Sequence, residues 1–309
     1  MRAVACTRPR ARAHTIASTS SAHDHRASAS AVSRRASSLG FALSTALASN
    51  VSTSSPARAG GSTGAPRDDD DDDDVDFFTE YPYAKPADVI PYVERKARRG
   101  DPASVLRAYD AFGRKYPTYK LGAEKSALYG NEVLDTIEDL RCVVEIGTFL
   151  GYSAIATAMR FRDPTARLLC VEFEERHADV ARWAIDYAGL SDRIEVLTRA
   201  GSDAVDEARA FVNRVKGEGR GTDVLFLDHA KERYLPDLKL YEDAGIVRQG
   251  TIVVADNVVY PGAPGYLEYV DSASKRYDTR LLEAMFEYDQ IWKQDWVTPK
   301  DALSVSVRL

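Results

Sequence analysis

The chain has 309 residues, a formal net charge of −6 from 41 basic and 47 acidic side chains, and 44% hydrophobic residues. That length and apolar content suffice for one large or two ordinary packed domains, and the mildly acidic balance argues against nucleic acid as a partner. No run of 18 or more apolar residues occurs, so we expect no membrane span.

The N-terminal 76 residues differ in composition from the rest. Residues 1–67 carry nine arginines and one acid, Asp24, among many Ser and Ala residues, which is typical of a chloroplast or mitochondrial transit peptide. An untargeted disordered tail, with the protein in the cytoplasm, is the alternative. The paired arginines at 34–35, a weakly apolar stretch and an Ala-x-Ala ending also fit a second, lumenal export signal. The aspartates at 68–74 indicate a solvated linker. We therefore predict a tail and linker over 1–76 and a folded domain over 77–309.

Helices and strands alternate from residue 100 onward. Helical spacing predicts helices at 100–117, with Asp101 as the N-cap and Pro102 in the first turn, and at 123–140. A buried strand, a glycine turn and a helix follow within 142–161. Further strands are predicted at 166–174, 193–199, 222–228 and 250–257, separated by helices at 175–190, 203–215 and 236–244. Alternation at 279–288 and 302–309 indicates two antiparallel strands that close one edge. The order predicts one doubly wound α/β domain with a mainly parallel sheet and helices on both faces.

The turn after the first strand suggests a nucleoside site. Gly147 and Gly151 permit a tight turn and close approach of a ligand to the backbone. Their G-x-x-x-G spacing lacks the pattern that cradles a pyrophosphate. Glu172 ends the second strand, where a carboxylate can accept hydrogen bonds from both ribose hydroxyls. A ribose site without a pyrophosphate loop suits S-adenosylmethionine. Glu145 would balance its cationic amino-acid end, unless it is a strand-end carboxylate paired with an arginine.

Polar residues end the fourth and fifth strands. Asp228 follows one, and Asp256 and Asn257 follow the other. Neighbouring parallel strands can end at the same edge, and carboxylate and amide oxygens suit Mg²⁺. Taken alone, Asp256 and Asn257 would also fit a plain polar turn. Lys231 comes three residues after Asp228, and near a cation a lysine can be held neutral as a base. The alternative for Lys231 is a solvated charged turn.

Three segments, "GYSA", "FLDHAKERYLPD" and "ADNVVYPGAP", together resemble the catechol O-methyltransferase family of class I methyltransferases. The resemblance runs from about Gly100 to "FEYDQ" at 286–290, with the motifs in the same order. It implies a Rossmann-like fold, with a seven-stranded, mostly parallel sheet whose last strand is antiparallel.

The same resemblance implies an activity and a set of site residues. The reaction would be the Mg²⁺-dependent transfer of a methyl group from S-adenosylmethionine to one hydroxyl of a catechol, by a monomer. Asp228, Asp256 and Asn257 become the metal ligands, and Lys231 becomes the general base. Substrate contacts fall to Lys231, Asn257, Glu287 and Pro261, with Glu287 bound to the second catechol hydroxyl. The implied cofactor contacts are Leu121, Glu145, Gly147, Phe149, Ser153, Glu172, Phe173, Ser202, Asp203, Asp228 and His229.

The acceptor pocket departs from the family pattern. Ala230 and Pro117 stand where the mammalian members have tryptophans, which leaves room for a larger catechol unless Tyr116 or Tyr119 fills the gap. Within the same class, a caffeoyl-type or other vicinal-diol acceptor is the alternative. A nicotinamide-dependent oxidoreductase would share the sheet, but the missing turn glycine and the metal residues count against it. A non-catalytic binding protein on the same scaffold is a third possibility, which the joint presence of the metal, base and substrate residues argues against.

Overall fold

The computed structural model describes residues 85–116, 118–263, 265–272, 275–287 and 297–309. The predicted tail and linker lie outside these ranges, as does Pro117, so the transit-peptide and domain-boundary predictions stay predictions. None of the described helices combines the length and hydropathy that a membrane span requires.

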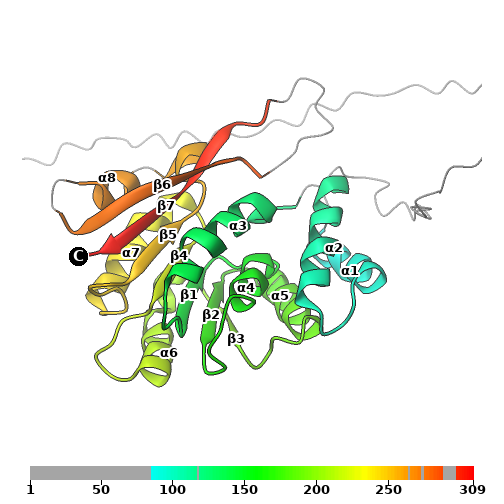
Figure 1. The fold of residues 1–309 in the computed structure, drawn as a ribbon, viewed down its shortest axis with the longest axis horizontal. Helices are drawn as coiled ribbons and strands as arrows, with labels where there is room; N and C mark the ends of the chain where they lie inside the picture. The colour runs from blue at the N-terminus through cyan, green and yellow to red at the C-terminus, as the bar shows by residue number, and fades with distance from the viewer. Residues whose placement is uncertain (1–84, 117, 264, 273–274, 288–296) are drawn as a thin grey trace, which may run out of the picture. The chain divides into compact units, whose positions relative to one another are not determined.

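Seven strands form one sheet in the order β3-β2-β1-β4-β5-β7-β6 (Figure 1). Strand β7 pairs antiparallel with both β5 and β6, and the other pairs are parallel. The predicted seven-stranded fold is therefore confirmed. The strands are β1 Cys142–Ile146, β2 Arg167–Glu172, β3 Ile194–Thr198, β4 Val224–Leu227, β5 Ile252–Ala255, β6 Tyr277–Met285 and β7 Lys300–Arg308.

Helices cover both faces of the sheet because the central strands β4 and β5 are apolar at every position and β1 is apolar at every position but Glu145. Alternate side chains of a strand point to opposite faces, so Val143 and Phe226 join one apolar core, and Val144 and Leu225 join the other. Helices α1–α5 pack on the first side and α6–α8 on the second. They are α1 Val89–Lys96, α2 Pro102–Lys115, α3 Gly122–Glu132, α4 Tyr152–Ala158, α5 Glu175–Tyr187, α6 Val205–Lys216, α7 Tyr234–Asp243 and α8 Tyr266–Val270.

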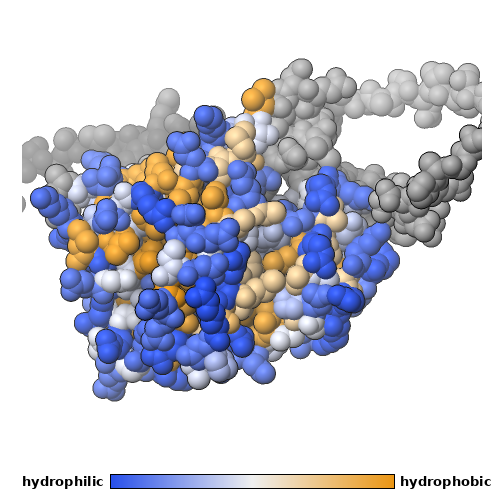
Figure 2. Space-filling view, in the orientation of Figure 1, coloured by the Kyte–Doolittle hydropathy of each residue, from blue (hydrophilic) through white to orange (hydrophobic). Residues whose placement is uncertain are grey.

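The outer faces of these helices are polar. In the space-filling view, hydrophilic residues cover much of the visible helical exterior, and hydrophobic side chains show around β5–β7 and in a band over the region of α3–α5 (Figure 2). This arrangement is expected for amphipathic helices that bury one stripe against a sheet.

Several helix boundaries test the sequence reasoning. Asp101 caps α2 as predicted, since its side chain accepts a hydrogen bond from the Ser104 backbone N–H at 3.1 Å. The helix predicted at 123–140 was too long: α3 ends at Glu132, after the weak helix formers Gly130 and Asn131. Helices α1 and α8 were not predicted.

Candidate functional site

The carboxyl ends of β4 and β5 bring Asp228 and Asp256 to the same edge of the sheet. Leu227 pairs with Ala255 in the parallel register, so these two acids are the next residues on neighbouring strands. The Asp256 N–H still bonds to the Leu227 carbonyl at 3.0 Å, which keeps the ends aligned. Asn257 then turns the chain with φ +55°, a left-handed conformation that asparagine tolerates better than most residues.

Asp256 is fully buried, and its two carboxylate oxygens have different surroundings. Oδ1 accepts a hydrogen bond from the Asn257 N–H at 2.7 Å and lies 2.7 Å from the Lys125 ammonium. Oδ2 is buried and has no hydrogen-bond partner among the described residues. Burial, together with the charges of Asp228 and Glu287, raises the pKa of Asp256 well above its usual range. The ionised form of Asp256 therefore lacks a stabilising positive charge at Oδ2. A cation bound at that oxygen would supply it.

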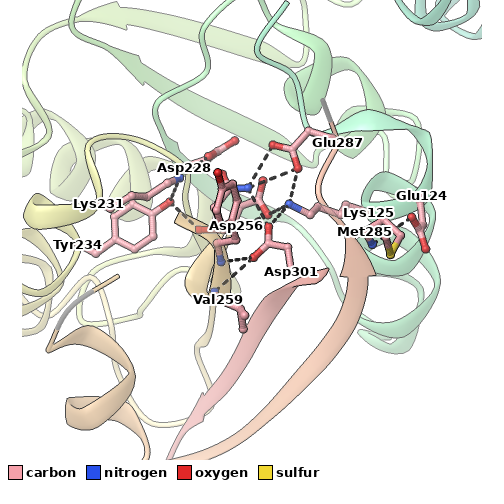
Figure 3. A network of polar contacts seen from close by, with 12 residues as sticks. Glu124, Lys125, Asp228, Lys231, Tyr234, Asp256, Val259, Met285, Glu287 and Asp301 are labelled. Carbon is pink, nitrogen blue, oxygen red and sulfur yellow. Dashed lines mark hydrogen bonds and ion pairs between the residues drawn. The ribbon is translucent and has the colours of Figure 1, made fainter. Parts of the chain in front are cut away.

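Lys125 enters this site from α3, and its ammonium sits between three carboxylates. Nζ lies 2.7 Å from Asp256, 2.5 Å from Glu287 and 2.6 Å from Asp301, and only 1% of the lysine is exposed (Figure 3). Carboxylate oxygens of these three acids lie within 4.8 Å of one another, which by spacing alone would suit a metal ion. Since the lysine ammonium already fills the space between them, that cluster is an ion-pair site.

The amide of Asn257 has a defined orientation because its neighbours are carboxylates, which only accept hydrogen bonds when ionised. Its Nδ2 donates to Asp301 at 2.9 Å and to Glu287 at 3.1 Å. The other oxygen of Asp301 accepts from the backbone N–H groups of Val259 and Tyr260. The amide oxygen of Asn257 is therefore the atom left for a ligand. Asp228, Asp256 Oδ2 and this oxygen are hard donors that fit Mg²⁺.

Lys231 lies beside the same edge. Its Nζ donates to Asp228 Oδ1 at 3.0 Å and to the Tyr234 hydroxyl at 2.6 Å, and that hydroxyl donates to the Asp256 carbonyl at 3.0 Å (Figure 3). Only 18% of the Lys231 side chain is exposed, which is not the environment of a freely solvated turn. Tyr234 is fully buried, so its ring holds the hydroxyl in place.

A cavity of about 550 Å³ adjoins this edge, beside β1, β2 and β4. Nine of the eleven cofactor residues implied by the resemblance line it: Leu121, Gly147, Phe149, Ser153, Glu172, Phe173, Ser202, Asp228 and His229. The other two lie off the wall. Glu145 is buried beneath Ser153, whose hydroxyl donates to it at 2.7 Å, and Asp203 is exposed.

Glycine is required at position 147 because the backbone that follows β4 lies against it. Its φ is +91°, and a Cβ added there would lie 2.3 Å from the Asp228 carbonyl oxygen. The glycine thus lets the turn that lines the cavity pack directly against the backbone that follows β4. Phe149 also has a left-handed φ of +48°, which is an outlier for a bulky residue.

Two carboxylates, Glu172 on the cavity wall and Glu145 behind it, have distinct electrostatic settings. Glu172 accepts the Phe149 and Glu174 N–H groups, both at 2.9 Å, so each of its oxygens keeps one lone pair for a ligand hydroxyl. Burial raises the pKa of Glu145 to about 7, and its Oε2 has no partner in the described chain. No arginine pairs with Glu145 in the described ranges, so the structure does not show the arginine pairing weighed as its alternative role.

His229 and the acceptor-side residues complete the surroundings. His229 Nε2 lies 3.0 Å from Asp237, while its Nδ1 is buried with no partner among the described residues. Ala230 is exposed on the cavity wall, and Tyr119 packs edge-on against Phe149 on the same wall. Tyr116 instead packs against Phe112 in the core. Pro261 is exposed in the turn Val258–Gly262.

Sequence reasoning missed Lys125 and Asp301. They lie on α3 and β7, far along the chain from the strand ends that they contact, and neither has a local pattern that marks it. Asp301 lies at the start of the last strand, and only the antiparallel pairing of that strand brings it to the site.

Comparisons with known proteins all find O-methyltransferases. A family model described as O-methyltransferase matches residues 114–305. The catechol O-methyltransferase of Bos taurus is 35% identical over 208 residues, which cover 67% of this chain and 74% of that protein. Catechol O-methyltransferase B of Danio rerio is 38% identical over 66% of this chain and 74% of its own. An O-methyltransferase from Bacillus cereus, solved in complex with SAH, has a TM-score of 0.52 at 22% identity, over 67% of this chain and 90% of its own, and so shows the fold alone.

Proposed function

This chain belongs to the O-methyltransferase family, and from that premise we propose that it is a Mg²⁺-dependent catechol O-methyltransferase that uses S-adenosylmethionine. One observation carries the metal part of the proposal. Asp228, the amide oxygen of Asn257 and the Oδ2 of Asp256, which has no partner among the described residues, gather at one edge of the sheet, beside the cavity.

Residues on the cavity wall and directly behind it fit the parts of S-adenosylmethionine. Glu172 has free lone pairs for the ribose hydroxyls, and the buried carboxylate of Glu145 suits the α-ammonium group. Binding that cation would favour the ionised form of Glu145. The cavity wall reaches Asp228, so a methyl donor held there lies next to the proposed acceptor site.

The site suits a substrate with two neighbouring hydroxyls, because it offers two separate side chains that can each bind one of them. Lys231 lies on one side, and Glu287, bonded to Asn257 at 3.1 Å, lies on the other. A phenol with a pKa of roughly 10 is only about one-thousandth ionised at neutral pH. A divalent cation held by Asp228, Asp256 and Asn257 would favour the phenolate form.

Lys231 is the proton acceptor of the reaction. The two N–H groups of its neutral amine donate to Asp228 and Tyr234, so the nitrogen lone pair can face the substrate hydroxyl. The hydroxyl proton passes to Nζ, the oxygen forms a bond to the methyl carbon, and the sulfur–carbon bond breaks to leave S-adenosylhomocysteine. General bases of this kind contribute about 10²- to 10⁴-fold to rate.

Caffeoyl-type and other vicinal-diol acceptors would use the same residues, and they are the alternative substrates. Ala230 and Tyr119, both on the exposed part of the cavity wall, are the positions where acceptor preference would be set. We also propose that the enzyme acts as a monomer on a small molecule, which size-exclusion chromatography with light scattering would check.

The test combines the full chain, labelled S-adenosylmethionine and a panel of catechols and single-hydroxyl phenols, with Mg²⁺ or with EDTA. We expect a monomethylated product from catechols only, lost with EDTA and restored by excess Mg²⁺. Lys231→Met should lower kcat at least about 100-fold. Lys216→Met is the matched control, because Lys216 also pairs with an aspartate, at 2.6 Å, but does so at the opposite end of β4.

The arms of this experiment separate the claims. If EDTA leaves the turnover unchanged, the reaction does not require Mg²⁺ and the metal part of the proposal is refuted. Cofactor binding without methylation of any catechol would remove the acceptor class.

A further inference from the structure

Behind the three proposed metal donors lies a buried ion-pair cluster of Lys125, Asp256, Glu287 and Asp301 (Figure 3). We propose that Lys125 is a positioning residue: its ammonium keeps a divalent cation out of this cluster and directs the cation to Asp228, Asp256 and Asn257. The inference rests on the metal part of the proposed function.

Without Lys125, the carboxylates of the cluster could themselves bind a metal ion and compete with the proposed site. The three carboxylates each offer an oxygen within 4.8 Å of the others, and they are almost fully shielded from solvent. Without the lysine, three buried carboxylates would face one another unpaired, which is unfavourable enough that a cation would be drawn to them. The Lys125 ammonium satisfies all three.

Lys125 also determines which Asp256 oxygen is available. Oδ1 is held twice, by Nζ and by the Asn257 N–H, each at 2.7 Å. Oδ2 is left without a partner among the described residues. Because the carboxylate is anchored through one oxygen, it presents the other to the edge where Asp228 and Asn257 lie.

Asp301 links Lys125 to Asn257 and so fixes the orientation of the Asn257 amide. It accepts from Nδ2 at 2.9 Å and from Lys125 at 2.6 Å, and its other oxygen holds the backbone of Val259 and Tyr260. The amide nitrogen is thereby turned into the cluster and the amide oxygen away from it. One lysine thus supports two of the three donors.

Formal charges agree with this division. With all four carboxylates ionised and Lys231 neutral, as a proton acceptor must be, Asp228, Asp256, Glu287 and Asp301 contribute four negative charges and Lys125 one positive charge, which leaves −3. One divalent cation reduces that to −1. Loss of Lys125 would leave −4 before the cation binds, with the excess concentrated in the cluster.

The test measures Mn²⁺ binding to the full chain by electron paramagnetic resonance, which needs no turnover. Four proteins form a cycle: wild type, Asp228→Asn, Lys125→Met and the double variant. In the wild type we expect D228N to weaken Mn²⁺ binding at least about tenfold, as is usual for loss of a metal ligand or its support. In the K125M background the same change should have little effect, because the cation no longer depends on Asp228.

Two controls keep the cycle interpretable. Lys125→Arg retains the positive charge, so it should restore the dependence on Asp228. Calorimetric affinity for S-adenosylmethionine should be unchanged in K125M, since Lys125 does not line the cofactor cavity. If K125M does not fold, anomalous scattering from wild-type crystals soaked in Mn²⁺ locates the cation: a peak at Asp228, Asp256 and Asn257 supports its exclusion from the cluster, and a peak within the cluster refutes it.

Opposite results would overturn the inference. A D228N effect of equal size in both backgrounds would show that Lys125 does not place the cation, as would an anomalous peak between Asp256, Glu287 and Asp301. A wild type that binds no Mn²⁺ would instead refute the metal requirement of the proposed function, and this inference with it.

Discussion

Replacing Gly147 with alanine tests how closely the glycine turn of the cavity depends on the backbone at Asp228. Gly147 has φ +91°, and the new Cβ would lie 2.3 Å from the Asp228 carbonyl oxygen and 2.8 Å from the His229 nitrogen. Both neighbours are backbone atoms of the segment that follows β4, so no side chain can move aside to relieve the overlap.

The magnitude has two parts. A left-handed φ costs a non-glycine residue about 1–2 kcal/mol, offset by about 0.4–1 kcal/mol from a less flexible unfolded chain. The overlap adds about 1–3 kcal/mol of the kind seen when cores are overpacked. Gly250→Ala is the matched control, because Gly250 has φ +87° and nothing within 4 Å of its added Cβ.

Urea unfolding of both variants, followed by titration with S-adenosylmethionine and Mn²⁺, separates these parts. We expect G250A to lose about 1 kcal/mol or less with unchanged ligand affinity. G147A should lose about 2–4 kcal/mol and bind both ligands more weakly, because Asp228 must shift. Equal stability and equal affinities in the two variants would refute the close-packing argument.

Three further substitutions probe single groups. Glu172→Gln should weaken S-adenosylmethionine binding about 10- to 100-fold by calorimetry, because a carboxylate that accepts backbone N–H groups is replaced by a partial donor; an unchanged affinity would argue against a ribose contact. Glu145 has a folded pKa of about 7, above its usual 4.5, so in cofactor-free protein its contribution to stability is present below about pH 4.5 and is lost as pH rises towards 7 and above. Urea unfolding across that range should show a flatter decline for Glu145→Gln, and an identical slope would contradict the assigned burial. Tyr234→Phe should lower kcat about tenfold at unchanged cofactor affinity, since Lys231 loses a 2.6 Å hydrogen bond; an unchanged kcat would show that Tyr234 does not position the base.

The gathering of Asp228, Asp256 and Asn257 followed from local patterns. Short apolar runs predicted the strands, and polar residues directly after two of them predicted their meeting place. This reasoning succeeded because neighbouring parallel strands end at the same edge, so a position along the chain becomes a position in space. The same logic placed Gly147 and Glu172 around one cavity.

How those groups are held depends on contacts that form only in the folded domain. Lys125 and Asp301 come from α3 and β7, and their meeting with Asp256 depends on helix packing and strand pairing that no local pattern encodes. The requirement for glycine at 147 arises from the backbone of Asp228, and the raised pKa of Glu145 arises from burial. Strand periodicity is local, so the sequence alone was enough to predict which strand ends bring the polar residues together. Which oxygen of Asp256 is free, and what keeps it free, depends on contacts between distant segments.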